Sequence, residues 1–559
     1  MFKFLSWGAL ALLVVFGGVF LVFRHDRIGF LIQINNALNP IGPNQAVSWQ
    51  AGPAQPEAEA QKRPPNIIVI LADDLGHNDV SAFGGGIANG LVKTPNIDSI
   101  GQNGAILENG YVAHAVCAPS RAALMTGRTP RRLGFEYNAT PPVLQRLGYA
   151  DLKNDKRLQK GPARLIYHKE NEKYAPPMDR MGLDPSEVTL PDVLKNAGYH
   201  TVVIGKWHLG GSRNLRPNAR GFDEALTFLE GAALYAPAKM RGIVNAKLDY
   251  DPTNKVIWQA TRFAVRRNDG KLFRPKTYLT DYFGDEAKAA IIANRNRPFF
   301  LYLPFNAPHT PLQATQADYD LFPGIEDHGL RVYAAMVHAL DRNVGKVLQT
   351  LKEQGLADNT LVYFLSDNGG TSMVGFDDIN KPFRGWKQTF FEGGVHTPFF
   401  VQWPARIPAG TRITERASSV DIFATSLKAA GAAMPTDRAF DGVNLLPVLE
   451  GTQKNLAPRD LYWRSGPYYS LITQDGWKLQ YSQRLDIHWL FDLNNDPNEH
   501  ANLASAQPER VAAMRARMKE LDKDAREPLW PLLIEQPVRV DHTIKDETAA
   551  GQEYLYWVE

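Results

Sequence analysis

Four short runs of apolar residues, rich in β-branched and aromatic side chains, stop abruptly at charged or polar positions. They are residues 66–72, 200–205, 299–305 and 360–366. Strands that are apolar on both faces are typical of a parallel sheet covered by helices on either side. Residues 188–197 and 332–353 have helical spacing, and glycine follows each of them within two positions. The alternation predicts an α/β fold with a large, mainly parallel sheet and helices on both faces.

The residues that follow these runs carry side chains that bind ions or move protons. In chain order they are Asp73, Asp74, Lys206, His208, His309, Asp367 and Asn368. In open α/β sheets, ligands bind beyond the carboxyl ends of the strands. Each cluster taken alone is more typical of an ordinary solvated loop than of a functional site. Four strand ends with complementary chemistry predict one functional site.

Four of these positions offer only oxygen ligands, from Asp73, Asp74, Asp367 and Asn368. Oxygen ligands suit a hard divalent cation such as Ca²⁺ or Mg²⁺ and do not suit zinc. Three converging carboxylates would also repel one another without a cation. Asp-Asp and Asp-Asn are common turn dipeptides, so the pairs need a further motif to connect them.

The single cysteine of the chain, Cys117, excludes an intramolecular disulfide and a multi-cysteine metal site. Residues 117–128 read Cys-Ala-Pro-Ser-Arg-Ala-Ala-Leu-Met-Thr-Gly-Arg. Pro119 suits the first turn of a helix and Gly127 suits its end, which places Cys117 at a helix N-terminus. Free backbone amides favour an anion there. An isolated cysteine would otherwise be read as a small buried hydrophobic residue.

This stretch resembles the sulfatase signature, Cys-x-Pro-Ser-Arg followed by Leu-x-Thr-Gly-Arg. Residues 198–208 resemble the second sulfatase signature, and residues 384–394, with Lys387, resemble a later lysine-bearing motif. The resemblance extends from about residue 65 to residues 490–499. It implies an arylsulfatase-type enzyme of the alkaline-phosphatase superfamily, with a smaller C-terminal subdomain that contains an antiparallel sheet.

In that family the motif cysteine is oxidised to formylglycine, whose hydrate attacks the sulfur of a sulfate ester and later expels sulfate. The resemblance therefore implies a covalent sulfo-enzyme intermediate on Cys117, Ca²⁺ as cofactor with Mg²⁺ as an alternative, and a formylglycine-generating enzyme as partner. The implied metal ligands are Asp73, Asp74, Cys117, Asp367 and Asn368.

The implied catalytic residues are those that steady the diol, bind sulfate or transfer protons. They are Cys117, Arg121, Lys206, His208, His309 and Lys387. By resemblance, Arg121 steadies the diol, Lys206 binds sulfate and His208 is the base for sulfate release. His309 and Lys387 bind sulfate oxygens and help to protonate the leaving group, and the sequence leaves open which of them is the acid.

The chain ends predict a tethered protein. Residues 4–23 carry no charge over 20 positions, about 30 Å of helix, which is enough to span a bilayer. An uncleaved anchor is favoured over a cleaved signal peptide, and the catalytic part is expected in the periplasm or otherwise outside the cytoplasm. The expected divisions are an anchor (1–25), a linker (26–64), a catalytic domain (65–440) and a C-terminal α+β subdomain (441–559).

Two regions are less informative. The polar excursion within residues 131–182 reads as a solvated surface segment, with a lid over the active site as the alternative. Residues 469–473 and 477–481 flank Gln-Asp-Gly and predict a hairpin.

Charge and chemistry limit the functional classes. Sixty-two basic residues against 59 acidic ones give a net charge of +3, too small to indicate nucleic acid as a partner. Two alternatives to a sulfatase remain: a phosphate diester or phosphonate monoester hydrolase on the same scaffold, and a non-catalytic binder of sulfated glycans with unmodified Cys117.

Overall fold

The structure, a computed structural model, describes residues 27–56, 58–59, 62–153, 155, 163–549 and 551–558. The apolar segment 4–23, predicted to be a membrane anchor, lies outside these residues and stays a prediction. Among the helices of the described ranges, none combines the length and the apolar character needed to cross a membrane.

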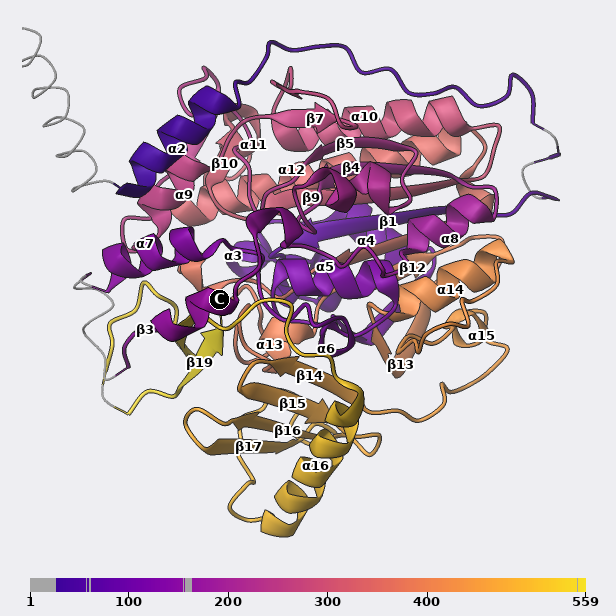
Figure 1. The fold of residues 1–559 in the computed structure, drawn as a ribbon. Coiled ribbons are helices and arrows are strands. Elements are labelled where there is room, and N and C mark those ends of the chain that lie inside the picture. Colours follow the sequence, from indigo (N-terminus) through magenta and orange to yellow (C-terminus); the bar gives the residue numbers. More distant parts are fainter. Residues whose placement is uncertain are drawn as a thin grey trace, which may run out of the picture.

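Within these ranges a mixed ten-stranded sheet forms the centre of the molecule (Figure 1). Its strands, in spatial order, are β13 (Thr411–Ser418), β2 (Ala105–Tyr111), β12 (Phe399–Gln402), β11 (Thr360–Ser366), β1 (Asn66–Asp73), β9 (Phe299–Pro308), β4 (His200–Lys206), β5 (Glu224–Phe228), β7 (Val265–Arg267) and β8 (Leu272–Phe273).

The four apolar runs form neighbouring parallel strands in the middle of this sheet, which confirms the predicted fold class. β1 pairs with β11 in register from Asn66 opposite Thr360 to Ala72 opposite Ser366. Asp73, the last residue of β1, and Asp367, the first residue after β11, therefore lie side by side. The pairing register of β1 and β11 therefore brings these two carboxylates together.

Alternate residues of β1 enter two different hydrophobic cores, because side chains along a strand point to opposite faces. Ile67, Val69 and Leu71 belong to one core, and Ile68 and Ile70 belong to the other. Every residue of β1 is buried. Full burial on both faces explains why this strand is an uninterrupted apolar run.

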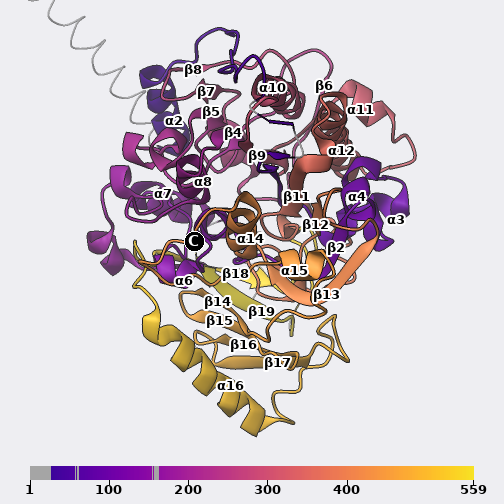
Figure 2. The same cartoon turned by 90° about the vertical axis from the view of Figure 1, so that its right-hand side faces the viewer.

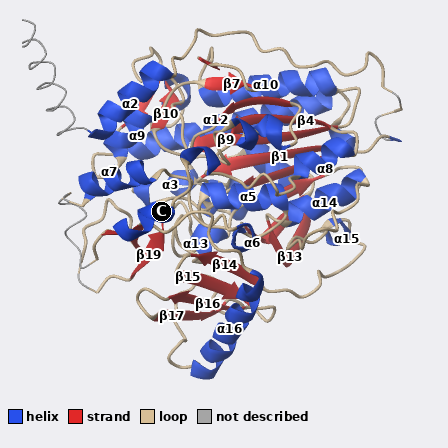
Figure 3. Ribbon diagram, in the orientation of Figure 1, coloured by secondary structure: helices blue, strands red, loops and turns tan. Residues whose placement is uncertain are grey.

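Helices cover both faces of the sheet (Figures 2 and 3). One core contains residues of α4 (Pro95–Gln102), α10 (Leu279–Asn294) and α12 (His328–Glu353). The other contains residues of α5 (Cys117–Thr126), α8 (Leu190–Asn196) and α14 (Asp421–Ala430). The predicted helices at 188–197 and 332–353 correspond to α8 and α12, and α12 begins four residues earlier than predicted.

A four-stranded antiparallel sheet follows, which confirms the predicted hairpin within a smaller C-terminal sheet. Its strands are β14 (Leu461–Ser465), β15 (Tyr468–Ile472), β16 (Trp477–Ser482) and β17 (Ile487–Asp492). α16 (Pro508–Leu521) packs on it through Met514 and Met518.

The last described residues belong to a separate three-stranded sheet. β18 (Ile534–Arg539) pairs with β19 (Tyr554–Val558) and with β3 (Ile166–Tyr167), which lies in the excursion after residue 131. The chain terminus and that excursion are thus joined in a second small sheet. The sequence reading assigned all residues after 440 to one sheet-containing unit and did not anticipate this pairing.

Candidate active site

The carboxyl ends of the central strands bring the predicted residues into one cluster. Ligand atoms of Asp73, Asp74, Cys117 and His309 all lie within 4.8 Å of one another. Asp73 ends β1, and His309 follows β9. Cys117 begins α5, which lies against the sheet. The geometry therefore joins residues that are up to 236 positions apart in the sequence.

Cys117 is the first residue of α5, as the sequence predicts, and the helix ends at Gly127 with a left-handed φ of 66°. Every residue of α5 is buried. The Cys117 Sγ lies 3.4 Å from Asp73 Oδ1 and 3.2 Å from Lys387 Nζ. Burial, reinforced by Asp367, raises the pKa of the thiol above its ordinary value.

Three carboxylates and one amide face the space beside Cys117. The Asp74 amide donates to Asp367 Oδ1 at 3.3 Å, and the Asn368 Nδ2 donates to Asp74 Oδ1 at 2.8 Å. The Asn368 Oδ1 is buried without a hydrogen-bond partner among the described residues. A buried orphan oxygen beside carboxylates is what a hard cation would satisfy, so the donor set fits Ca²⁺ or Mg²⁺.

Arg121, one helical turn after Cys117, holds this acidic group in place. Its Nε donates to Asp367 Oδ2 at 2.8 Å, its Nη2 lies 2.7 Å from the same oxygen, and its Nη1 donates to the Lys206 carbonyl at 3.2 Å. The guanidinium is fully buried. Burial and the adjacent Asp73 nevertheless raise the pKa of Asp367, so Arg121 compensates only part of the repulsion.

Two lysines approach the cluster from different elements. Lys206 Nζ, at the end of β4, donates to Asp73 Oδ2 at 2.7 Å, and Lys387 Nζ donates to Asp74 Oδ1 at 2.7 Å. Burial alone would lower the pKa of Lys387, but the Asp74 carboxylate raises it well above the ordinary value. Lys387 is therefore a fixed positive charge beside Cys117.

Two histidines complete the site. His309 donates from Nδ1 to the Thr310 carbonyl at 2.6 Å, which leaves Nε2 facing Asp74 Oδ2 at 3.6 Å. Burial lowers the pKa of His309 to about 4. Burial and the charges of Lys206 and Arg121 lower the pKa of His208 well below its ordinary value. The two rings are thus neutral near pH 7 and able to accept protons.

The His208 ring packs against Gly231, where any larger residue would clash with it. A Cβ at Gly231 would lie 2.9 Å from the His208 Nε2, and the buried Nδ1 has no hydrogen-bond partner in the described chain. Gly231 was not among the predicted site residues.

A buried ion network behind Lys387 was not predicted. Lys478 Nζ, on β16, lies 2.7 Å from Glu392 Oε1 and 3.0 Å from Glu499 Oε1. The Glu392 amide donates to Glu499 Oε2 at 2.6 Å, and His396 Nδ1 lies 2.9 Å from Glu392 Oε2. The available signal was Glu392 within the lysine-bearing motif and Glu499 within the 490–499 motif. Their meeting depends on the packing of the two sheets.

Family models match most of the chain. A model described as Sulfatase matches residues 65–432, and one described as N-sulphoglucosamine sulphohydrolase, C-terminal, matches residues 384–526.

Two curated relatives and one solved structure illustrate the similarity. The chain is 33% identical over 426 residues to an N-acetylgalactosamine-6-sulfatase of Canis lupus familiaris, covering 76% of this chain and 73% of the relative. It is 32% identical over 492 residues to a steryl-sulfatase of Mus musculus, covering 76% and 70%. The crystal structure of Ps i-CgsB, also solved in complex with k-i-k-neocarrahexaose, superposes with a TM-score of 0.68 at 30% identity and covers 84% of this chain and 95% of that one.

Proposed function

Because the chain belongs to the sulfatase family of sulfuric ester hydrolases, we propose that this site cleaves an organic sulfate ester with a formylglycine made from Cys117. The observation that carries the proposal is the convergence of three carboxylates, two lysines and two histidines around one buried cysteine at a helix N-terminus. The transition state of a sulfate ester spreads negative charge over several oxygens, and fixed positive charges around it stabilise that charge.

The proposed cation is Ca²⁺, with Mg²⁺ as the alternative, and its proposed ligands are Asp73, Asp74, Asp367 and Asn368. When bound, it would neutralise the carboxylates and lower the pKa of an oxygen held on residue 117, and formylglycine would supply that oxygen in its hydrated form. Asn368 Oδ1 and the carboxylates already face the same space.

The chain's own cations orient and stabilise the sulfate group. Lys206 donates to Asp73 and Lys387 donates to Asp74. Both carboxylates are also proposed ligands of the metal ion. Negative charge spreads over the sulfate oxygens as the ester bond breaks, and preorganised donors stabilise that charge without reorganising. Arg121 keeps Asp367 in place and thereby fixes the position of residue 117 relative to the acids.

The neutral histidines and Lys387 move the protons. His208, with its unpartnered Nδ1, is the proposed base that takes a proton from residue 117 when sulfate is released. His309 and Lys387, on either side of Asp74, are proposed to bind sulfate oxygens, and one of them protonates the departing alcohol oxygen: Lys387 already carries a proton, whereas the neutral His309 must first take one up at Nε2. Proton transfer by positioned groups of this kind contributes about 10²–10⁴-fold to a rate.

A substrate panel tests this function. The enzyme should turn over an aryl sulfate with a far higher kcat/KM than a phosphate diester or a phosphonate monoester of the same phenol. The phosphorus alternative is not favoured, since the relatives of the chain are sulfatases. A preference for either phosphorus ester would reverse the assignment, and a native protein with a free thiol at Cys117 would favour the non-catalytic binder of sulfated glycans.

The remaining expectations are parts of the same proposal. Conversion of Cys117 requires a formylglycine-generating enzyme in the same cell. The anchor at 4–23 and the linker that follows it would hold the catalytic part outside the cytoplasm. Protease digestion of intact spheroplasts, compared with lysed ones, tests that location.

A further inference from the structure

The helix that precedes the central sheet, α2 (Arg27–Leu38), is apolar around most of its circumference and carries no charge after its first residue. It packs against α7 (Pro142–Leu152) and α9 (Asn254–Ala260) along one side of the molecule (Figure 1). Ile34 and Leu38, in its second half, are nevertheless exposed. Helices with apolar residues on most sides are typical of an apolar environment, so the uncovered side of α2 indicates a second apolar neighbour.

Adjacent segments extend this exposed apolar surface. Arg146 Nη1, on α7, lies 3.1 Å from Glu172 Oε2, so the segment after β3 lies beside that helix. In this segment Tyr174 and Met178 are 68% and 72% exposed. Of the ten large hydrophobic side chains that are exposed in the described ranges, six lie on α2, α7 and this segment, and we call them the α2–α7 face. They are Ile34, Leu38, Val143, Leu144, Tyr174 and Met178. Exposed apolar patches of this kind mark binding surfaces.

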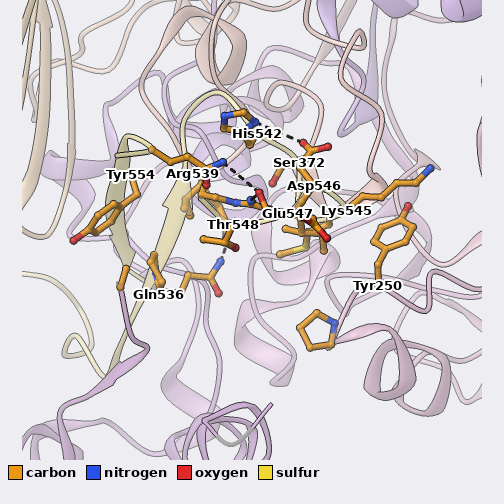
Figure 4. A pocket seen from close by; sticks show the side chains of 18 of the residues that line it. Tyr250, Ser372, Gln536, Arg539, His542, Lys545, Asp546, Glu547, Thr548 and Tyr554 are labelled. Carbon is orange, nitrogen blue, oxygen red and sulfur yellow. Dashed lines mark hydrogen bonds and ion pairs between the residues drawn. The ribbon is translucent and has the colours of Figure 1, made fainter. Parts of the chain in front are cut away.

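The segment after β3 is fixed to the body of the protein by the end of the chain. β3 pairs with β18, and His168 Nε2 lies 2.7 Å from Glu535 Oε1. Just before β3, Ala163 lines a cavity of about 360 Å³ whose other lining residues come largely from 536–554 (Figure 4). None of the six side chains of the α2–α7 face lines that cavity. The face is therefore an outer surface, carried by a segment with a fixed position.

α2 also has a fixed position, because the chain between it and β1 is bonded to the body along its course. The Gly42 amide donates to a carbonyl of β8 at 2.9 Å, and the Gly52 amide donates to a carbonyl of α10 at 2.8 Å. Between them, Trp49 Nε1 donates to Glu286 Oε2 at 2.9 Å, and Val47 and Trp49 pack against the core that contains α10. Any segment that precedes α2 is therefore attached to the body at one defined place, next to the α2–α7 face.

The sequence before α2 indicates what covers this face. The uncharged run 4–23 is the anchor of the proposed function, and only three residues separate it from α2. Fully extended chain from Phe23 to Arg27 spans at most about 14 Å. The headgroup layer on each side of the hydrocarbon core of a bilayer is about 5–8 Å thick. An anchor in that core therefore brings the start of α2 to the membrane surface.

We propose that the α2–α7 face rests on the bilayer that holds this anchor, with its apolar side chains among the lipid headgroups. The inference rests on the anchor in the proposed function. Tyr174 suits this place, because tyrosine is enriched at membrane–water interfaces, and Lys173 Nζ lies 4.7 Å from the centre of its ring. α2 lies outside both family models, which begin at residues 65 and 384. The face gives the catalytic domain one orientation on the membrane, which an anchor on a free tether would not.

Site-directed labelling of the full chain in phosphatidylcholine vesicles tests this contact. Single fluorophores are attached at three positions on the face and at two exposed control positions on α8 and β17: Leu38→Cys, Val143→Cys and Met178→Cys, with Asn196→Cys and Ile487→Cys as controls. Cys117 is buried, and the unaltered chain measures its background labelling. Each label is then exposed to a nitroxide-bearing lipid and, separately, to iodide in the water phase.

The lipid should quench the labels on the face several-fold more strongly than the control labels, and iodide should quench them several-fold less. Two charges on the face, Leu38→Glu with Val143→Glu, should abolish lipid quenching of the Met178→Cys label, because carboxylates resist transfer out of water. Asn196→Glu with Ile487→Glu is the matched control and should leave that quenching unchanged. Equal quenching at face and control positions, or no effect of the two charges on the face, would overturn the proposal.

Flotation of the vesicles after an alkaline wash separates this proposal from the proposed function. A chain that floats with the vesicles but has iodide-accessible labels on the face contradicts the contact and leaves the anchor standing. A chain that does not float contradicts the anchor, and the proposed contact with it. Neither measurement involves turnover, so the outcome does not depend on whether the site hydrolyses sulfate esters.

Discussion

Asp74 and His208 adopt left-handed backbone conformations, with φ of 65° and 60°. Residues other than glycine rarely adopt this backbone conformation, and each one that does destabilises the folded state by about 1–3 kcal/mol. Asp74 directly follows β1, His208 lies two residues after the end of β4, and both belong to the proposed site. Contacts such as Lys387 to Asp74 hold these conformations, so the strain lies where orientation matters for chemistry.

Replacing Lys206 tests the role of fixed positive charge. Lys206→Met keeps the volume of the side chain but removes a cation from the sulfate site, so kcat/KM for an aryl sulfate should fall about 10²–10³-fold. The exposed Lys428→Met on α14 is the control and should retain wild-type turnover. A loss of less than threefold at Lys206, with a folded protein, would contradict a role in binding sulfate.

Removal of the metal should affect activity and stability together. Dialysis against a chelator should lower turnover and the melting temperature, and added Ca²⁺ should restore both. A ligand at 100 times its Kd stabilises the folded state by about 2.7 kcal/mol. Asn368→Ala should require more Ca²⁺ for the same recovery, whereas the exposed Asn495→Ala should not. Turnover and melting that are both insensitive to the chelator would exclude the proposed cation.

At this scale the sequence predicted which side chains lie near one another, and their roles in catalysis and metal binding stay a prediction. Each polar residue placed after a strand lies in the cluster, because parallel strands bring their carboxyl ends to one edge. The unpredictable parts were Gly231 beside His208 and the Glu392–Lys478–Glu499 network. Those contacts depend on how separate loops and sheets pack, and short-range sequence patterns carry no information about such packing.

The segment that presents Lys387 is held at both ends by the C-terminal part of the chain. Before Lys387, Arg384 pairs with Asp541 at 2.6 Å and with Glu553. After it, Glu392 pairs with Lys478 on β16. The terminal segment and the small antiparallel sheet therefore hold the segment of Lys387, a proposed catalytic residue, although neither of them contributes a residue to the group formed by Asp73, Asp74, Cys117 and His309.

Lys478→Met should weaken this support. The substitution leaves Glu392 and Glu499 close together and buried without their cation, and breaking a buried pair costs about 3–5 kcal/mol. The melting temperature should fall, and kcat measured below it should fall as well because Lys387 loses its fixed position.

Two comparisons isolate the effect. The exposed Lys519→Met on α16 should change neither quantity. Lys478→Met combined with Glu499→Gln should recover part of the stability, since one buried negative charge is removed with the lysine. If Lys478→Met lowers neither melting temperature nor kcat, the network does not support the Lys387 segment.

For the whole molecule, the alternation of apolar strands and helices was sufficient to predict the four central strands of the sheet, since full burial on both faces leaves few other arrangements. The order of the outer strands β2, β12 and β13 was not predictable, because their pairings join residues about 300 positions apart. The pairing of β18 with β3 was hidden for the same reason. It joins short strands without a distinctive pattern.

The free energy of unfolding should depend on pH because of one buried carboxyl group, that of Asp79. Burial raises the pKa of Asp79 from 3.8 to about 8, although Tyr333 and the Gly76 amide donate to it. The folded state therefore keeps a proton that the unfolded state loses, and this contribution to stability falls as pH rises from about 4 to 8.

Asp79→Asn tests that linkage, because the amide keeps the shape and has no carboxyl group to ionise. The variant should lose less stability than the wild type as pH rises through this window, as measured by urea unfolding at several pH values. Parallel curves for the two proteins would show that Asp79 titrates alike in the folded and unfolded states.

The most direct test of the account is the mass of the peptide that contains Cys117, from protein purified from its native host. The account predicts an aldehyde in place of the thiol in a substantial fraction of the molecules, with the fraction rising in parallel with specific sulfatase activity. A fully active preparation in which every such peptide carries an intact thiol would contradict it.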